Sequence, residues 1–286
     1  MPRRRRSGIY RRASTVVGHA LGHVSHFAYR GPFRDWLSQQ LNSRRLITRT
    51  RIALPRGEGG LDGLRLVFLS DVHAGNYFDE RDWLHVCERV AAERPDLVCL
   101  GGDLINIHED ETLELRKGLA LLSPALGTYA VHGNHEYHAS DDPRRWRALL
   151  EECGVEVITN RGRRVTRNGA SLWLCGVDDY LRGEPDLPQA LQGRAPGEPT
   201  VLLAHHPDFF VESAAHVDLQ LSGHTHGGQV LVFGQTPLNH THYGFWSGYF
   251  ARAGSQLYVG RGVGTSFLPI RIDAPAEIAV IELSVG

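Results

Sequence analysis

The 286-residue sequence has few cysteines, no long apolar run and almost no net charge. Its four cysteines stand far apart without CxxC spacing, which argues against a disulfide framework and favours reduced core residues in a cytosolic chain. No stretch approaches the roughly 20 apolar residues of a membrane span, and no apolar signal core follows the Arg-rich start. With 42% hydrophobic and 22% charged residues, the composition excludes a disordered or collagen-like chain.

The net charge of −1 hides an uneven distribution. Residues 1–56 carry 13 Arg and a single acidic residue, Asp35, whereas the other 230 residues carry 18 basic and 31 acidic groups. We therefore expect two parts, a basic amphipathic helical arm over residues 1–56 and one larger domain over residues 57–286.

Two amphipathic helical patterns lie in the basic arm, from Ala13 to Ala28 and from Phe33 to Leu41, separated by Gly31-Pro32. A basic helix with Trp and Phe on its apolar side can lie in a membrane interface. Alternatively, the arm packs on the rest of the protein. The sequence leaves both interpretations open.

From residue 61 on, five short apolar runs each end in a polar turn. They are LRLVFLSDVH (64–73), PDLVCLGGDL (95–104), GTYAVHGNHE (127–136), PTVLLAHHPD (199–208) and VDLQLSGHTHGG (217–228). Helical patterns separate the first three runs, which predicts parallel strands with both faces of the sheet covered. Asn168-Gly169 predicts the turn of a hairpin.

Asp, His and Asn follow the apolar runs at the position where ligands collect in an α/β sheet, beyond the carboxyl ends of the strands. The residues are Asp71, His73, Asp103, Asn106, Asn134, His135, His205, His206, His224 and His226. Oxygen and imidazole ligands without cysteine suit Mn, Fe or Zn. Asp103, with strands on either side, is the candidate to bridge two ions, and two ions would clamp a phosphoryl group.

These motifs resemble a known family. D-x-H at 71–73, GGDLIN at 101–106, GNHE at 133–136, His205 and GHTHGG at 223–228 are similar to the signature of the calcineurin-like metallophosphoesterases, over about residues 61–286. The late YVGRGVGTSFLPIR (258–271) resembles the bacterial branch that includes single-domain phosphodiesterases. The resemblance implies an α/β (α+β) fold, a four-layer αββα sandwich of two mixed sheets, with the metal site at the C-terminal ends of the strands.

The resemblance also implies a role for each site residue. Asp71, His73 and His226 would hold the first metal, Asp103 would bridge, and Asn134, His205 and His224 would complete the second. His135 would stabilise the phosphoryl charge or protonate the leaving oxygen, help typically worth 10²–10⁴-fold in rate. His206 is expected to point away from the ligand beside it, and His240 and His242 are interpreted as loop residues or substrate contacts.

One departure from the family pattern concerns the residues after Asp103. In the eukaryotic phosphatases of the superfamily, an Asp three residues after the bridging Asp orients the catalytic His, and an Arg follows it. Here these positions hold Asn106 and Ile107. An amide can still hydrogen-bond an imidazole, but the phosphate clamp of the Arg is missing. The difference argues against a phosphoprotein phosphatase.

The expected function is therefore metal-dependent hydrolysis of a phosphodiester or pyrophosphate by a metal-bridging hydroxide that attacks phosphorus. The expected cofactors are two divalent ions, with Mn first and Fe or Zn as alternatives. One alternative function is a UDP-2,3-diacylglucosamine-type lipid pyrophosphatase, and another is a catalytically inactive binding protein on the same fold. We expect a cytoplasmic protein, attached peripherally to the anionic inner membrane face if residues 1–56 bind lipid. Nucleic acid is not an expected partner, because the acidic domain would repel a polyanion.

Overall fold

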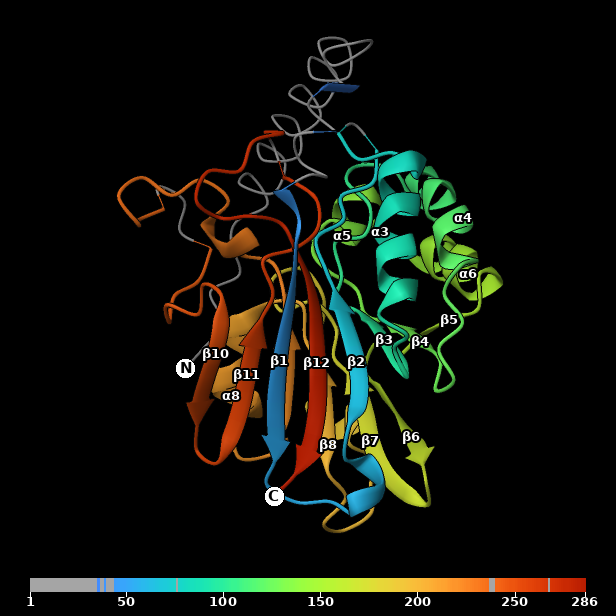
Figure 1. Cartoon of the computed structure of the whole chain (residues 1–286), viewed down its shortest axis with the longest axis vertical. Helices are drawn as coiled ribbons and strands as arrows, with labels where there is room; N and C mark the ends of the chain where they lie inside the picture. The colour runs from blue at the N-terminus through green and yellow to red at the C-terminus, as the bar shows by residue number, and fades with distance from the viewer. Residues whose placement is uncertain (1–34, 37–38, 40–43, 76, 237–239, 267) are drawn as a thin grey trace.

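Two six-stranded β-sheets lie face to face in the computed structural model, which describes residues 35–36, 39, 44–75, 77–236, 240–266 and 268–286 (Figure 1). The first sheet has the order β1 (Leu46–Leu54), β12 (Glu277–Val285), β2 (Leu64–Leu69), β3 (Leu97–Leu100), β4 (Thr128–Ala130) and β5 (Val155–Val157). The second has the order β10 (Gly248–Arg252), β11 (Ser255–Val259), β9 (Leu219–Ser222), β8 (Thr200–Leu203), β7 (Ala170–Gly176) and β6 (Arg161–Arg167).

Both sheets are mixed. In the first, β2, β3, β4 and β5 pair in parallel, while β12 runs antiparallel to β2 and parallel to β1. In the second, β7, β8, β9 and β11 pair in parallel, and the antiparallel strands β6 and β10 form the two edges. The parallel pairing of β2, β3 and β4 is the one expected from the helical patterns between these strands.

The main core lies between the sheets, because alternate side chains of each strand point to the same face. Leu66 and Phe68 of β2 meet residues such as Leu172, Leu203 and Leu221 of the second sheet, and all five are buried. The remaining side chains of β2, including Val67 and Leu69, point to the opposite face and form a second core with the helices.

Helices cover the outer face of each sheet. On the first lie α3 (Glu80–Ala92), α4 (Arg116–Leu119), α5 (Glu136–Ala139) and α6 (Arg144–Glu152), with η2 (Glu109–Leu115) beside them (Figure 1). The layer on the second sheet is thinner, with α7 (Leu187–Ala190), η3 (Pro207–Phe209) and α8 (Phe210–Ser213). The short turns η1 (Gly59–Leu61) and η4 (His226–Gly228) complete the elements. This arrangement confirms the expected four-layer sandwich.

The first sheet begins earlier than the sequence suggested. β1 starts at Leu46 and pairs along its length with β12, so residues 46–54 belong to the sandwich although the expected boundary was residue 56. β1 is an edge strand that alternates exposed Arg49 and Arg51 with buried Ile52 and Leu54, and its basic side chains concealed the strand. The amphipathic patterns up to residue 34 lie outside the described residues.

Other local expectations are confirmed. β6 and β7 form the predicted hairpin, in which Asn168 and Gly169 both have positive φ, of 50° and 81°. Cys87, Cys99 and Cys175 are buried free thiols, and Cys153 is a half-buried one. Among the described residues, no helix has the length and apolar character needed to cross a bilayer.

We predict that Phe68→Ala lowers the free energy of unfolding by about 3–5 kcal/mol, because the ring is 1% exposed and fills the space between the sheets beside Gly101 and Gly260. Urea denaturation measures the change. Leu121→Ala, at a residue that is 44% exposed, is the control and should shift stability by no more than about 0.5 kcal/mol. Equal effects of both substitutions would contradict this account of the core.

Candidate metal centre

The predicted site residues lie together at one end of the sandwich, in the turns that follow β2, β3, β4, β8 and β9. Asp71 and His73 follow β2, Asp103 follows β3, Asn134 and His135 follow β4, His205 follows β8, and His224 and His226 follow β9. Three of these strands belong to the first sheet and two to the second. The site is therefore assembled by the packing of the two sheets.

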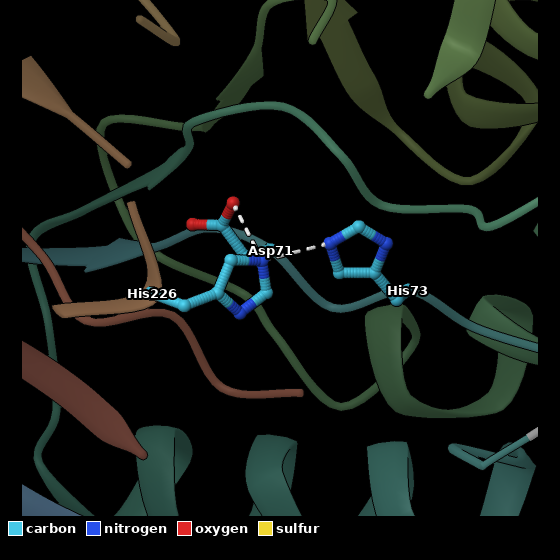
Figure 2. Close-up of side chains that lie close together, drawn as sticks. All are labelled: Asp71, His73 and His226. Carbon is cyan, nitrogen blue, oxygen red and sulfur yellow. Dashed lines mark hydrogen bonds and ion pairs between the residues drawn. The ribbon is translucent and has the colours of Figure 1, made fainter. Parts of the chain in front are cut away.

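The first group of candidate ligands is Asp71, His73 and His226, whose ligand atoms all lie within 4.8 Å of one another. Nε2 of His73 lies 3.1 Å from Nε2 of His226, which in turn lies 3.5 Å from Oδ1 of Asp71. Figure 2 draws both contacts as dashed lines that meet at the His226 ring. All three residues are buried.

The second group is Asp103, His205 and His224. Oδ2 of Asp103 lies 3.2 Å from Nε2 of His205 and 3.8 Å from Nε2 of His73, so this carboxylate stands between the two groups. Asn134 lies on the neighbouring loop, and its Oδ1 is buried and makes no hydrogen bond within the part of the chain that the structure describes. This is the arrangement that the sequence suggested, with Asp103 in the bridging position.

Five of the seven candidate ligands share an unusual backbone conformation, the left-handed region, which non-glycine residues rarely adopt. The five with positive φ are Asp71 (54°), His73 (50°), Asp103 (52°), His224 (69°) and His226 (53°). Such conformations cost of order 1–3 kcal/mol each and persist where the surrounding structure holds them. Their concentration in one cluster marks it as a functional site.

Two glycines make room for the carboxylates. A Cβ atom on Gly133 would collide with the Asp103 carboxylate, and one on Gly223 would collide with Asp71. The backbone of the GNHE turn (133–136) is therefore in direct contact with the Asp103 carboxylate, and that of the GHTH turn (223–226) with the Asp71 carboxylate. Only glycine permits this approach.

Glu136, which the sequence interpretation did not assign, joins two of the ligand loops. Its carboxylate is fully buried and accepts hydrogen bonds from the backbone N–H groups of Asp103 (3.0 Å), Leu104 (2.7 Å) and Gly133 (2.7 Å). Burial, reinforced by the nearby Asp103, raises the pKa of this carboxyl. Glu136 is the last residue of the GNHE motif, so the sequence did contain a hint of its role. The motif alone cannot show, however, that the Glu136 side chain folds back onto the loop after β3.

Backbone carbonyls and an arginine fix the imidazole rings. Nδ1 of His205 lies 2.8 Å from the carbonyl oxygen of Gly101, so it donates there and directs Nε2 toward Asp103. Arg271, also unassigned by the sequence, donates to the carbonyl of His226 at 3.1 Å and lies 3.2 Å from Nδ1 of the same residue. Burial lowers the pKa of Arg271 to about 9.

His135 lies beside the two groups of ligands and is held by two bonds. Its backbone N–H donates to Oδ1 of Asp103 at 2.8 Å, and its Nδ1 donates to the backbone carbonyl of Asn106 at 2.8 Å. The sequence interpretation placed the Asn106 side-chain amide in this role. In the structure the main chain of residue 106 makes the contact, and Glu111 fixes that segment by accepting from the N–H groups of Asn106 and Ile107.

The electrostatics of the centre favour cations. Burial alone would raise the pKa of Asp103, but the neighbouring His205, His135 and His73 hold it well below its ordinary value. Burial lowers the pKa of His73, His224 and His226 well below the usual range, which keeps these rings neutral. A neutral imidazole and an ionised carboxylate are the forms that bind metal.

The residues present fit a pair of divalent metal ions. The buried Oδ1 of Asn134 has no hydrogen-bond partner in the described part of the chain, and an unpartnered buried polar atom is costly. Burial opposes a proton on His205, yet the attraction of Asp103 raises its pKa well above the ordinary value, so this point of the site stabilises positive charge. The donor set of carboxylate, imidazole and amide matches first-row divalent metals.

Two further histidines contact the ring of a candidate ligand. The His206 ring, which was expected to point away from the neighbouring ligand His205, lies 4.3 Å from the ring of another ligand, His224, measured between centroids. β8 ends at Leu203, so the alternation of a strand no longer governs the direction of this side chain. His240, in the loop between β9 and β10, packs edge-on against His224 at 5.8 Å, while His242 is exposed.

The two sheets and the cluster of Asp, His and Asn at their ends define a metal-binding α/β protein. A family model described as calcineurin-like phosphoesterase matches residues 64–228, which contain every candidate ligand. The chain belongs to this family of metal-dependent phosphoester hydrolases.

Curated relatives agree with the family. An uncharacterized metallophosphoesterase of Helicobacter pylori is 34% identical over 77% of this chain and 60% of its own length. A transmembrane protein with metallophosphoesterase domain from Bos taurus is 32% identical over 83% of this chain and 56% of its own. The uncharacterized metallophosphoesterase YkuE of Bacillus subtilis is 30% identical, with coverages of 78% and 80%. The chain thus spans less than two thirds of the first two relatives.

We predict that Glu136→Gln weakens Mn²⁺ binding by about 10–100-fold, the usual effect of removing a residue that orients metal ligands. The amide nitrogen of glutamine would face backbone N–H groups where a carboxylate oxygen now accepts them. Calorimetric titration with Mn²⁺ measures the affinity. Glu151→Gln, at an exposed position of α6, is the matched control and should bind as the parent does. An unchanged affinity in Glu136→Gln would show that the loops hold their positions without this carboxylate.

Proposed function

We propose that the protein hydrolyses phosphodiester or pyrophosphate bonds with two divalent metal ions, Mn²⁺ first and Fe or Zn as alternatives. The observation that carries this proposal is the convergence of a complete donor set, with the Asp103 carboxylate between two groups of ligands that are buried except for the half-buried His224. A binding protein descended from this family would have no need to keep every donor. The complete set therefore disfavours the inactive alternative.

Each residue has a role in the proposed reaction. Asp71, His73 and His226 would hold one ion, Asn134, His205 and His224 the other, and Asp103 both. Two bound ions would neutralise charge on the phosphoryl group and lower the pKa of a water between them. Glu136 and Arg271 orient these ligands by their hydrogen bonds to the ligand loops.

His135 is proposed to act on the substrate. Because its Nδ1 donates to the carbonyl of Asn106, Nε2 is the nitrogen that exchanges a proton with the leaving oxygen or stabilises the phosphoryl charge. The bond to Asp103 through the backbone N–H fixes the ring relative to the bridging carboxylate. His135 is therefore the general acid of the proposal.

The Ile at position 107 supports diesters and pyrophosphates as substrates. Ile107 stands where an Arg follows the motif in eukaryotic phosphatases, so this position offers no guanidinium to a phosphomonoester dianion. A diester or the inner phosphate of a pyrophosphate carries less charge and depends less on such a clamp. Two substrate classes remain in the proposal, a soluble diester and a lipid-linked phosphoester such as UDP-2,3-diacylglucosamine.

A membrane-bound substrate is favoured by the charge of residues 1–56. Near an anionic leaflet each Arg is worth about 1 kcal/mol of attraction, and residues 1–44, which precede the first strand, carry nine of the 13 Arg. We therefore propose a cytoplasmic protein that attaches peripherally to the inner membrane face. The curated relative named as a transmembrane protein with metallophosphoesterase domain supports a membrane setting for such a domain.

We predict that His135→Ala lowers kcat by about 10²–10⁴-fold on bis(p-nitrophenyl) phosphate with added Mn²⁺. The same assay with p-nitrophenyl phosphate and UDP-2,3-diacylglucosamine ranks monoester, diester and pyrophosphate. Hydrolysis faster for the monoester than for the other two would contradict the proposed substrate class. Absence of hydrolysis of all three by the parent would favour the binding-protein alternative.

We also predict that Asn106→Ala retains the parent's kcat within about threefold, because the main-chain carbonyl of residue 106 orients His135. Asn106→Asp should behave in the same way. If Asn106→Ala instead lowered kcat as much as His135→Ala does, and Asn106→Asp restored it, the side chain of residue 106 would be the group that orients His135.

A further inference from the structure

Five large apolar side chains are exposed on two loops beside the metal centre. Val232 and Phe233 lie between β9 and β10, and Leu268, Ile270 and Ile272 lie between β11 and β12; we call these five the apolar loop surface. Phe233 is fully exposed, and the other four are exposed by 45–56%. Water-exposed apolar groups gathered in one place mark an interaction site more often than isolated ones do.

Backbone bonds make the two loops one surface. The N–H of Leu231 donates to the carbonyl of Ile272 at 3.0 Å, and the N–H of Ile272 donates to the carbonyl of Gln229 at 2.9 Å. The Gln229 side chain donates to the carbonyls of Ser266 and Leu268. These hydrogen bonds therefore fix the positions of the two loops that carry the exposed side chains.

The apolar loop surface borders the metal centre. Arg271 lies between two of its members in sequence and donates to the carbonyl of the candidate ligand His226. Gln229, which ties the loops together, directly follows η4, the turn that begins with His226. A binding partner in contact with the apolar loop surface would therefore lie next to the metal centre.

The Arg-rich segment joins the sandwich at the same place. Arg45, just before β1, donates through Nε and Nη2 to the carbonyl of Val263, and the N–H of Leu46 donates to the carbonyl of Ala276. Both acceptors belong to the connection between β11 and β12 that carries Leu268, Ile270 and Ile272. Figure 1 shows this connection, the loop after β9 and the start of β1 at one end of the molecule.

Only one kind of partner matches both features. A polyanion such as nucleic acid would attract the nine Arg of residues 1–44 but offers no apolar phase to Phe233 and its neighbours. An apolar groove on a protein would cover Phe233 but has no reason to carry a high negative charge. An anionic lipid bilayer supplies negative headgroups and hydrocarbon at the same surface.

We propose that the apolar loop surface inserts into the interface of an anionic lipid bilayer, with the Arg-rich segment on the headgroups. Insertion at this place brings the metal centre to the bilayer, where a phosphoester carried by a lipid would reach it. This last step rests on the proposed function, whereas the docking does not. The structure thus assigns the membrane-facing side of the sandwich, beyond attachment by residues 1–56 alone.

Vesicle sedimentation of the full chain tests the docking. The vesicles contain equal parts of phosphatidylglycerol and phosphatidylcholine, or phosphatidylcholine alone. The test variant is Phe233→Asp with Leu268→Asp. The matched control is Leu113→Asp with Leu121→Asp, which adds the same charge at two leucines that are 40% and 44% exposed, on η2 and just after α4.

We expect the parent to sediment with the anionic vesicles. The test variant should bind them at least about tenfold more weakly, because two apolar anchors are lost. The control should bind within about twofold of the parent. Far-UV circular dichroism and a thermal unfolding curve verify that each variant is folded, and Phe233→Ser replaces the test variant if the latter does not fold.

Three results would overturn the proposal. The parent fails to sediment with anionic vesicles; the test variant and the control bind equally; or the test variant abolishes a dimer of the parent without weakening vesicle binding, which would place a second copy on this surface. Failure of the parent to hydrolyse any phosphoester would contradict the proposed function but leave the vesicle result standing, since sedimentation requires no turnover.

Discussion

The position of one buried carboxylate, Asp103, is the constraint on which the rest of the site depends. The side chain lies between two groups of histidines, accepts a hydrogen bond from the His135 backbone and occupies space that any side chain at position 133 would fill. Its own backbone is in the left-handed region and is held there by Glu136. A charge buried in this way is costly without partners of opposite charge, so the site is built to hold cations.

Because its ligands come from both sheets, the centre couples metal binding to the packing of the sandwich. Asp71 and Asp103 follow strands of the first sheet, whereas His205 and His224 follow strands of the second, and the core around Phe68 lies between the two sheets. An ion bound across that interval would stabilise the folded state, since the unfolded chain has no preformed site. The fold and the proposed chemistry thus depend on the same contact between sheets.

One end of the molecule combines three properties. The ligand turns, the apolar loop surface and the entry of the Arg-rich segment meet there because the parallel strands of both sheets end at that edge and β1 begins there. Arg271 and Gln229 link the apolar loop surface to the metal centre, since their hydrogen bonds join the apolar loops to the turn that carries His226. A substrate anchored in lipid and a site placed at the lipid would require this kind of arrangement.

The sequence by itself determined the five strands whose turns carry the site, the position of the hairpin turn and which Asp, His and Asn residues meet, because apolar runs and polar turns are local patterns and parallel strands end at a shared edge. Only the tertiary structure decided that β1 joins the sheet, since its partner β12 lies some 230 residues away in sequence. The same holds for Glu136, for the His206 ring against His224, and for the carbonyl, rather than the amide, of Asn106 against His135. Each of these depends on the distance between atoms of segments remote in sequence, and no local pattern of residues encodes such a distance.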